Sequence, residues 1–222
     1  MIVVHALMDE AAYPWMADWY RARVEAAQGR QFPHKYRLYY VDHAMHTTRD
    51  YSLDDARPAT QTRIVSYQGV LQQALRDLAL WVEKGMAPPP STHYRVRDGQ
   101  IALPATGAER KGLQPVVALT VNGEQHIDAK VGEELTFRGE VQAPPETGYV
   151  VSADWDFEGV GDYPVKSQIA EPQEHLVLEE RYAFSTPGTY FPVLKAASSR
   201  RAENSSPYAR PENIARVRVV IT

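Results

Sequence analysis

The chain has 222 residues, 44% hydrophobic and 23% charged, a composition typical of a folded globular protein. Its net charge is −4 and no block of Lys or Arg stands out, which argues against a nucleic-acid partner. The absence of cysteine excludes disulfides, thiolate metal sites and a cysteine nucleophile. No apolar run approaches the ~20 residues that span a bilayer, and no basic segment precedes the apolar N-terminus, so we expect neither a membrane span nor a signal peptide in this sequence.

Residues 1–92 alternate between strand and helix patterns. A continuous apolar run at residues 2–7 predicts a strand covered on both faces. Pro14 suits the first position of a helix, whose apolar residues recur at helical spacing up to a C-cap at Gly29. Aromatic and β-branched residues at 36–41 predict a second strand.

A polar stretch at residues 46–62 predicts a loop, and a long helix follows it. We expect the buried face of this helix to be formed by Ile64, Tyr67, Leu71, Leu75, Leu78 and Val82. The order strand, helix, strand, helix is typical of a parallel α/β sheet. Two strands are too few for a covered parallel sheet, so we expect further strands to come from outside this segment.

The remainder of the chain has a different pattern. Residues 93–112 are predicted to be a linker, with a short hairpin around Asp98-Gly99. Residues 113–222 show short alternating strands separated by turn signals, which predicts an antiparallel β-sandwich. We expect its core to include Leu135, Phe137, Trp155, Phe157, Tyr182, Tyr190, Val217 and Val219.

Three residues near the ends of the two predicted parallel strands could carry chemistry. Asp9 follows the first strand, and His43 and His46 follow the second. The carboxyl ends of parallel strands lie at one edge of a sheet, where open α/β folds build their sites. A carboxylate at this edge can orient a histidine and stabilise its imidazolium, so the histidine can act as a general base.

Residues 4–10, 36–46 and 75–89 resemble the C-terminal end of an α/β-hydrolase of the tannase and feruloyl-esterase type. The fold class implied for residues 1–92 is a partial α/β-hydrolase domain, the C-terminal end of its parallel sheet. The resemblance implies that Asp9 is the acid of a catalytic triad and His46 its histidine, with His43 as the runner-up. It also implies a small ester as substrate, no cofactor or metal, and an extracellular or periplasmic parent protein.

The sequence departs from this family in one important respect, because it contains no Gly-x-Ser-x-Gly motif. The nearest match, around Ser66, lacks the first glycine and lies within a helical pattern. The family's nucleophile precedes its acid, and only eight residues precede Asp9. We therefore expect this chain to be inactive alone and to act on an ester only with an upstream segment.

Residues 153–159 and 182–190 resemble segments of the polycystic-kidney-disease (PKD) domain, an immunoglobulin-like β-sandwich. In this pattern Trp155 and Phe157 are expected in the core, with the alternating acidic residues facing solvent rather than binding calcium. The sandwich could bind a carbohydrate or a protein, with Tyr163 or Tyr208 as exposed aromatic candidates. The alternative to an esterase portion is thus a non-catalytic β-sandwich module, for binding or structure, with a docked α/β segment.

Overall fold

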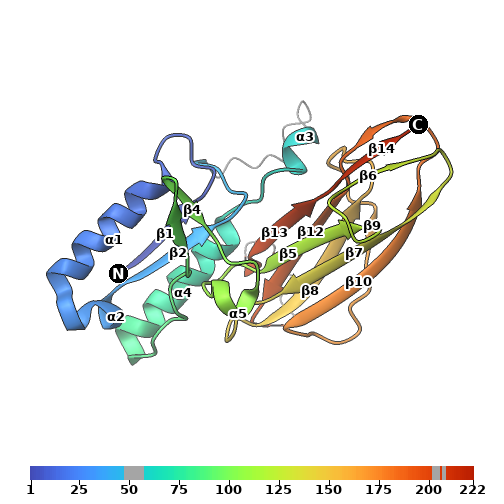
Figure 1. Cartoon of the computed structure of the whole chain (residues 1–222). Helices are drawn as coiled ribbons and strands as arrows, with labels where there is room; N and C mark the ends of the chain where they lie inside the picture. The colour runs from blue at the N-terminus through green and yellow to red at the C-terminus, as the bar shows by residue number, and fades with distance from the viewer. Residues whose placement is uncertain (48–57, 202–205, 207–208) are drawn as a thin grey trace.

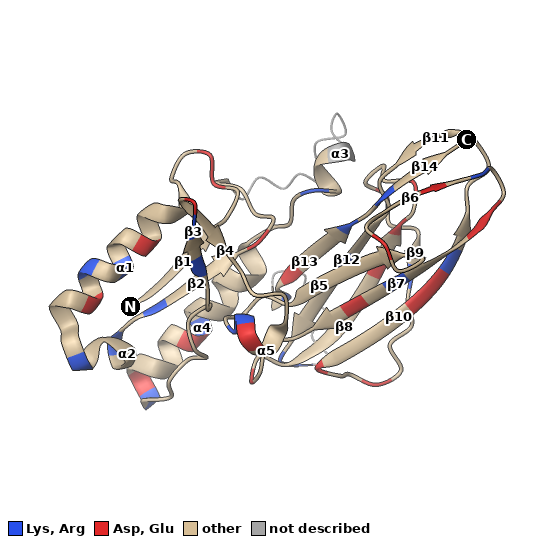
Figure 2. Cartoon of the chain, viewed as in Figure 1, with Lys and Arg blue, Asp and Glu red and all other residues tan. Residues whose placement is uncertain are grey.

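The computed structural model of the chain describes residues 1–47, 58–201, 206 and 209–222. Two parts lie side by side, an α/β part at the N-terminal end and a β-rich part at the C-terminal end (Figure 1). We call residues 1–92 the α/β segment and residues 113–222 the sandwich. Acidic and basic residues are distributed over both parts (Figure 2). No described helix is long and apolar enough to cross a membrane.

The α/β segment is built around two parallel strands, as the sequence predicts. Val4 of the first strand lies opposite Tyr39 of the second. The elements in chain order are β1 (Ile2–Ala6), α1 (Pro14–Gln28), the 3-10 turn η1 (Gly29–Gln31), α2 (Phe32–Lys35), β2 (Arg37–Val41), α3 (Pro58–Gln61) and α4 (Gln68–Lys84). Pro14 begins α1, and glycines with positive φ follow α1 and α4, at Gly29 and Gly85. The predicted caps of α1 are therefore confirmed.

The buried face of α4 differs from the prediction. The buried residues are Gly69, Val70, Ala74 and Asp77, whereas Leu75 and Val82 are exposed. Gly69 packs so closely on the sandwich that an added Cβ would lie 2.1 Å from the carbonyl oxygen of Arg210. The side of α4 with small residues, such as Gly69 and Ala74, is therefore the buried one. The longer side chains of Leu75 and Val82 lie on the side that faces solvent.

The outer edge of β2 is covered by the polypeptide that follows α4. The amide of Thr92 donates to the carbonyl of Leu38 at 2.9 Å. In turn, the amides of Leu38 and Tyr40 donate to the hydroxyls of Ser91 and Thr92, each at 3.1 Å. Within the described residues β1 pairs with β2 alone.

Residues 93–112, the predicted linker, contain regular secondary structure. They form the expected hairpin, β3 (Arg95–Arg97) with β4 (Gln100–Ala102), and the short helix α5 (Gly107–Arg110). Arg110 is buried, and its guanidinium donates to the carbonyl of Pro104 at 2.8 Å and to Asp42 at 3.3 Å. The segment is thereby packed against the loop that follows β2. The division into domains at residues 92 and 113 remains a prediction.

The C-terminal part is a β-sandwich of mainly antiparallel strands. Its strands are β5 (Val116–Val121), β6 (His126–Ala129), β7 (Glu134–Gln142), β8 (Tyr149–Asp156), β9 (Val165–Lys166), β10 (His175–Ala183), β11 (Gly188–Tyr190), β12 (Val193–Ser199), β13 (Glu212–Arg216) and β14 (Arg218–Ile221). They form sheets in the orders β10-β7-β5, β13-β12-β8-β9 and β11-β14-β6, in which only the β14–β6 pair is parallel.

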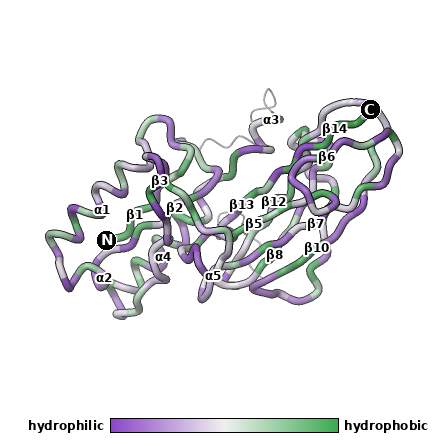
Figure 3. The backbone as a smooth tube through the Cα atoms, in the orientation of Figure 1, coloured by the Kyte–Doolittle hydropathy of each residue, from purple (hydrophilic) through white to green (hydrophobic). Residues whose placement is uncertain are grey.

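One hydrophobic cluster fills the sandwich. Its largest members are fully buried aromatic and aliphatic residues contributed by several sheets, including Leu135, Phe137, Trp155, Phe184 and Leu194. Of the predicted core residues, Tyr182 and Tyr190 are only partly buried and pack against this cluster. Hydrophobic and hydrophilic residues alternate along several strands of the sandwich (Figure 3).

The acidic residues of β8 do not all face solvent, and this corrects the sequence-based expectation. Asp156 is buried, and its two carboxylate oxygens accept the amides of Gly159 at 2.8 Å and Gly161 at 2.6 Å. Burial raises the pKa of Asp156, although these hydrogen bonds act in the opposite direction. Strand alternation fails here because the turn after the strand offers backbone donors to an inward-facing carboxylate.

Candidate acid–histidine site

Asp9 and His46 lie at the carboxyl edge shared by β1 and β2. Backbone pairing continues past both strands, because the amide of Leu7 donates to the carbonyl of Val41 and that of Met8 to Ala44, each at 2.9 Å. The two chain segments therefore leave the sheet side by side. This continued pairing brings residues 37 positions apart in the sequence into direct contact.

Asp9 is held in place by backbone amides of the segment between β1 and α1. One carboxylate oxygen accepts the amides of Ala11 at 2.9 Å and Ala12 at 2.7 Å. Its side chain is only 9% exposed. Burial alone would raise the pKa of Asp9, but the hydrogen bonds from Ala12, His46 and Ala11 lower it below its usual range. Asp9 is therefore an ionised carboxylate of fixed orientation.

The imidazole of His46 is oriented by that carboxylate. Its Nδ1 lies 3.0 Å from both oxygens of Asp9, and its side chain is 48% exposed. The hydrogen bond and the charge of Asp9 raise the pKa of His46. Because Nδ1 is engaged, exchange of a proton with a substrate would fall to Nε2. This is the arrangement that the base and acid of a triad require.

His43, the runner-up for the histidine, faces the sandwich. Its Nδ1 lies 3.0 Å from the Oδ1 of buried Asn213, and its backbone has a positive φ of 54°. The structure thus pairs His46, and not His43, with Asp9. The catalytic role of the pair remains a prediction.

The serine nearest in pattern to a nucleophile is poorly placed for that role. Ser66 is exposed and precedes α4 without a strand before it, and its Oγ accepts the amide of Gln68 at 3.2 Å. The residue before it, Val65, is buried against Val193 and Ile214 of the sandwich. Ser66 therefore follows a residue that contacts the sandwich and does not lie on a strand-to-helix elbow.

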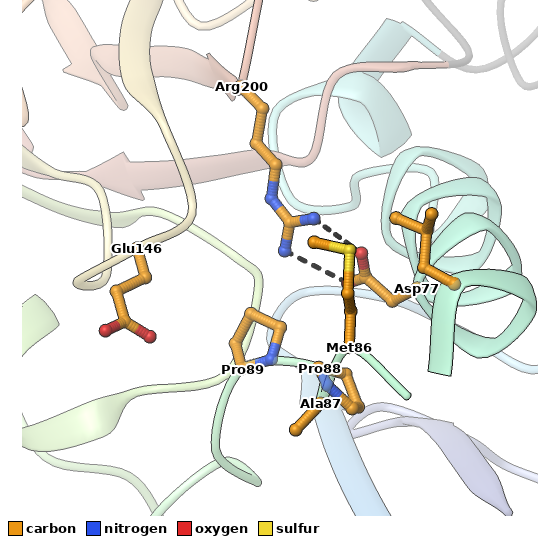
Figure 4. Close-up of a pocket in the computed structure, with 8 residues that line it drawn as sticks. Asp77, Met86, Ala87, Pro88, Pro89, Glu146 and Arg200 are labelled. Atoms are coloured by element: carbon orange, nitrogen blue, oxygen red, sulfur yellow. Dashed lines mark hydrogen bonds and ion pairs between the residues drawn. The ribbon is translucent and has the colours of Figure 1, made fainter. Parts of the chain in front are cut away.

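Sequence reasoning missed a polar contact that fastens α4 to the sandwich. Asp77 is buried and accepts two hydrogen bonds from the guanidinium of Arg200, at 2.5 and 3.0 Å, and a third from Gln73 at 3.0 Å. The pair lies beside a cavity of about 260 Å³ with Pro88 and Glu146 in its lining (Figure 4). Helical periodicity gives no signal for this contact, because its partner Arg200 lies 123 positions from Asp77.

A second buried polar contact joins the loop that carries His43 to the sandwich. Gln114 is buried, and its Oε1 accepts a hydrogen bond from the backbone amide of Asp42 at 2.7 Å. Its own amide group donates to the carbonyl oxygens of Asp42 at 3.0 Å and Glu212 at 2.8 Å. The loop that carries the histidines is thereby tied to β13 of the sandwich.

Tyr163, one of the two aromatic candidates for carbohydrate binding, makes contacts within the protein. The hydroxyl of Tyr163 donates to the carbonyl of Gln61 at 2.7 Å, and Lys195 lies 4.1 Å from its ring centre. Tyr208 lies outside the described residues. Among the residues that the structure describes, no group of three or more His, Cys, Asp or Glu could hold a metal ion.

No family model matches the sequence, and no curated protein matches it. Solved structures with some similarity include a crystal structure of the CARDB domain of the PF1109 protein from Pyrococcus furiosus, in complex with di-metal ions. It is 16% identical over 49% of this chain and 90% of that chain, with a TM-score of 0.34. A solution NMR structure of the same domain is 15% identical over 49% of this chain and 96% of that chain, with a TM-score of 0.33. Similarity this weak supports no conclusion on function.

Proposed function

We propose that the α/β segment supplies the acid and the general base of an esterase-type site. Asp9 is the acid, His46 is the base, and a segment outside these 222 residues supplies the nucleophile. The observation that carries the proposal is the 3.0 Å contact between Nδ1 of His46 and both oxygens of Asp9. In this proposal the sandwich is an accessory module against which the α/β segment packs.

The proposed chemistry follows from the charges of the pair. An ionised Asp9 keeps the imidazole in the tautomer with a proton on Nδ1 and stabilises the cation that forms when Nε2 takes the nucleophile's proton. The raised pKa of His46 makes it a stronger base. The missing parts are the serine and the oxyanion donors, which in such enzymes come from earlier segments of the fold.

The edge of β1 and the outer face of α1 are uncovered in the described chain. This favours the proposal that a further segment packs against them. β1 has one strand neighbour in the described part of the chain, although its sequence is almost wholly apolar. Beside it, α1 buries only Ala17. The exposed large hydrophobic residues at this end are Met1, Met8, Tyr13, Trp15, Met16, Trp19 and Tyr20. A parallel sheet normally has both faces and its central strands covered.

The reading frame upstream of the codon for Met1 tests this proposal. We expect an open frame that encodes Gly-x-Ser-x-Gly, and an extended chain that includes it should hydrolyse esters. His46→Ala should abolish that activity, whereas His34→Ala, which changes an exposed histidine on α2, should not. An in-frame stop before any such motif, or activity that survives His46→Ala, would refute the proposal.

A second candidate function is a non-catalytic binding or structural module with the α/β segment docked on it. The observation that favours it is the extent of buried polar contact between the parts, through Asp77–Arg200 and Gln114. A carbohydrate or protein ligand would then bind the sandwich. Under this alternative, variants of Asp9 and His46 would leave every activity of the full-length parent unchanged.

A further inference from the structure

A basic groove lies in the segment between the two parts, away from Asp9 and His46. It is a cavity of about 580 Å³ between the β3–β4 hairpin and α5. The groove-lining residues used below are His93, Arg95, Arg97, Leu103, Glu109 and Lys111. Its volume falls within the ~300–1,000 Å³ range of small-molecule sites.

Strand alternation places the cations of the groove on one face. His93, Arg95 and Arg97 are two residues apart, so their side chains project from the same side of extended backbone. The other side of this hairpin packs inward, because Tyr94 and Ile101 join a hydrophobic cluster of the α/β segment. Figure 2 shows basic residues on this hairpin.

The charge of the groove is opposite to that of the whole protein. Three permanent cations, Arg95, Arg97 and Lys111, face one carboxylate, Glu109, in a chain of net charge −4. Glu109 already accepts a hydrogen bond from Thr106 at 3.2 Å. Within the described residues the side chains of Arg95 and Lys111 make no hydrogen bond or ion pair, and Arg97 has only an exposed ion pair with Asp98 at 3.9 Å.

Hydrogen bonds and apolar packing hold the backbone around these cations in place without a ligand. The amide of His93 donates to the carbonyl of Arg110 at 2.7 Å, which joins the start of the hairpin to the end of α5. The guanidinium of buried Arg110 joins the same helix to Pro104 at 2.8 Å. Leu103 packs on the neighbouring hydrophobic cluster and gives the groove an apolar wall.

We propose that this groove binds a small organic polyanion, a molecule with two or more carboxylate or phosphate groups on an apolar body. The anionic groups would contact Arg95, Arg97 and Lys111, since guanidinium binds both kinds of oxyanion through paired hydrogen bonds. The apolar body would lie against Leu103. This site is independent of the proposed hydrolytic function.

The test is titration of the intact chain with trimesate and with the bisphosphate ester of resorcinol, followed by amide NMR shifts. We expect saturable binding of at least one probe, with shifts centred on residues 93–97 and 109–111, and no binding of uncharged trimesamide. The preferred probe distinguishes carboxylate from phosphate ligands.

The matched variants are Arg95→Gln/Arg97→Gln in the groove and Arg30→Gln/Arg218→Gln at exposed positions elsewhere, with the same loss of charge. The first pair should weaken binding about tenfold or more, and the second should leave it almost unchanged. Equal weakening by both pairs, equal binding of trimesamide, or no saturable binding of either small probe at millimolar concentration would each overturn the proposal.

Discussion

The guanidinium of Arg200, on the loop after β12, donates two hydrogen bonds to the carboxylate of Asp77, on α4. The two residues are 123 positions apart, and the carboxylate is almost fully buried while the guanidinium is partly exposed. A buried ion pair of this kind contributes little over an apolar pair, but leaving one charge without its partner is costly. The contact therefore ties the position of α4 to that of the sandwich.

Arg200→Leu should reduce the free energy of unfolding by about 3 kcal/mol, because among the described residues it leaves the buried Asp77 carboxylate with Gln73 as its one remaining side-chain donor. The double variant Asp77→Leu/Arg200→Leu should recover most of that loss. Urea unfolding followed by tryptophan fluorescence measures both. The control is Arg181→Leu, which breaks an exposed ion pair with Glu134 and should cost less than about 1 kcal/mol. Equal losses for Arg200→Leu and Arg181→Leu would show that the buried pair does not couple the two parts.

Gly69→Ala should also destabilise the chain, by about 1–3 kcal/mol, because the new methyl group would collide with the backbone at Arg210. In an unconstrained helix the same change would stabilise by about 1 kcal/mol. Gly188→Ala is the matched control, since its Cβ would meet neighbours at ordinary contact distances of 3.4 Å or more. If Gly69→Ala proved as stable as the parent chain, the close packing of α4 on the sandwich would be wrong.

The pH dependence of the Asp9–His46 pair follows from its opposite pKa shifts. The raised pKa of His46 means that its contribution to stability is complete below the unfolded value and is lost as the pH rises through the folded value. The lowered pKa of Asp9 means that its contribution is present above its unfolded value and is lost as the pH falls through the folded value. The pair should therefore stabilise most between about pH 4 and pH 6.5.

Histidine NMR titration of the parent chain and of Asp9→Asn checks this directly. We expect the pKa of His46 to fall in Asp9→Asn, because the variant removes the negative charge next to Nδ1. An unchanged pKa of His46 would mean that the contact is not populated in solution.

Part of this site could be predicted because local rules determine it. Consecutive parallel strands end at one edge of a sheet, so sequence position was enough to predict that Asp9 lies near the loop that carries His43 and His46. The choice between His46 and His43 depended on a family resemblance. The structure separates the two because Asn213, from the far end of the chain, engages His43.

The errors have a common physical origin in contacts that are distant in sequence or made by the backbone. Helical periodicity favoured Leu75 and Val82 as the buried side of α4, but the sandwich selects the side that contains Gly69 and Asp77. Strand alternation does not predict the hydrogen bonds from the amides of Gly159 and Gly161 to buried Asp156. The basic groove has no signal in the sequence, because Arg95 and Arg97 alternate along β3 and Lys111 comes from the far end of α5.

Ester turnover tests the central claim, that Asp9 and His46 are the acid and base of a site whose nucleophile lies outside these residues. The 222-residue chain should show no saturable turnover of p-nitrophenyl acetate or of a gallate or ferulate ester. The chain extended upstream through Gly-x-Ser-x-Gly should turn them over, with kcat reduced ~10⁶-fold by His46→Ala and ~10⁴-fold by Asp9→Asn. Saturable turnover by the 222-residue chain, or an extended chain whose kcat is indifferent to His46→Ala, would contradict it.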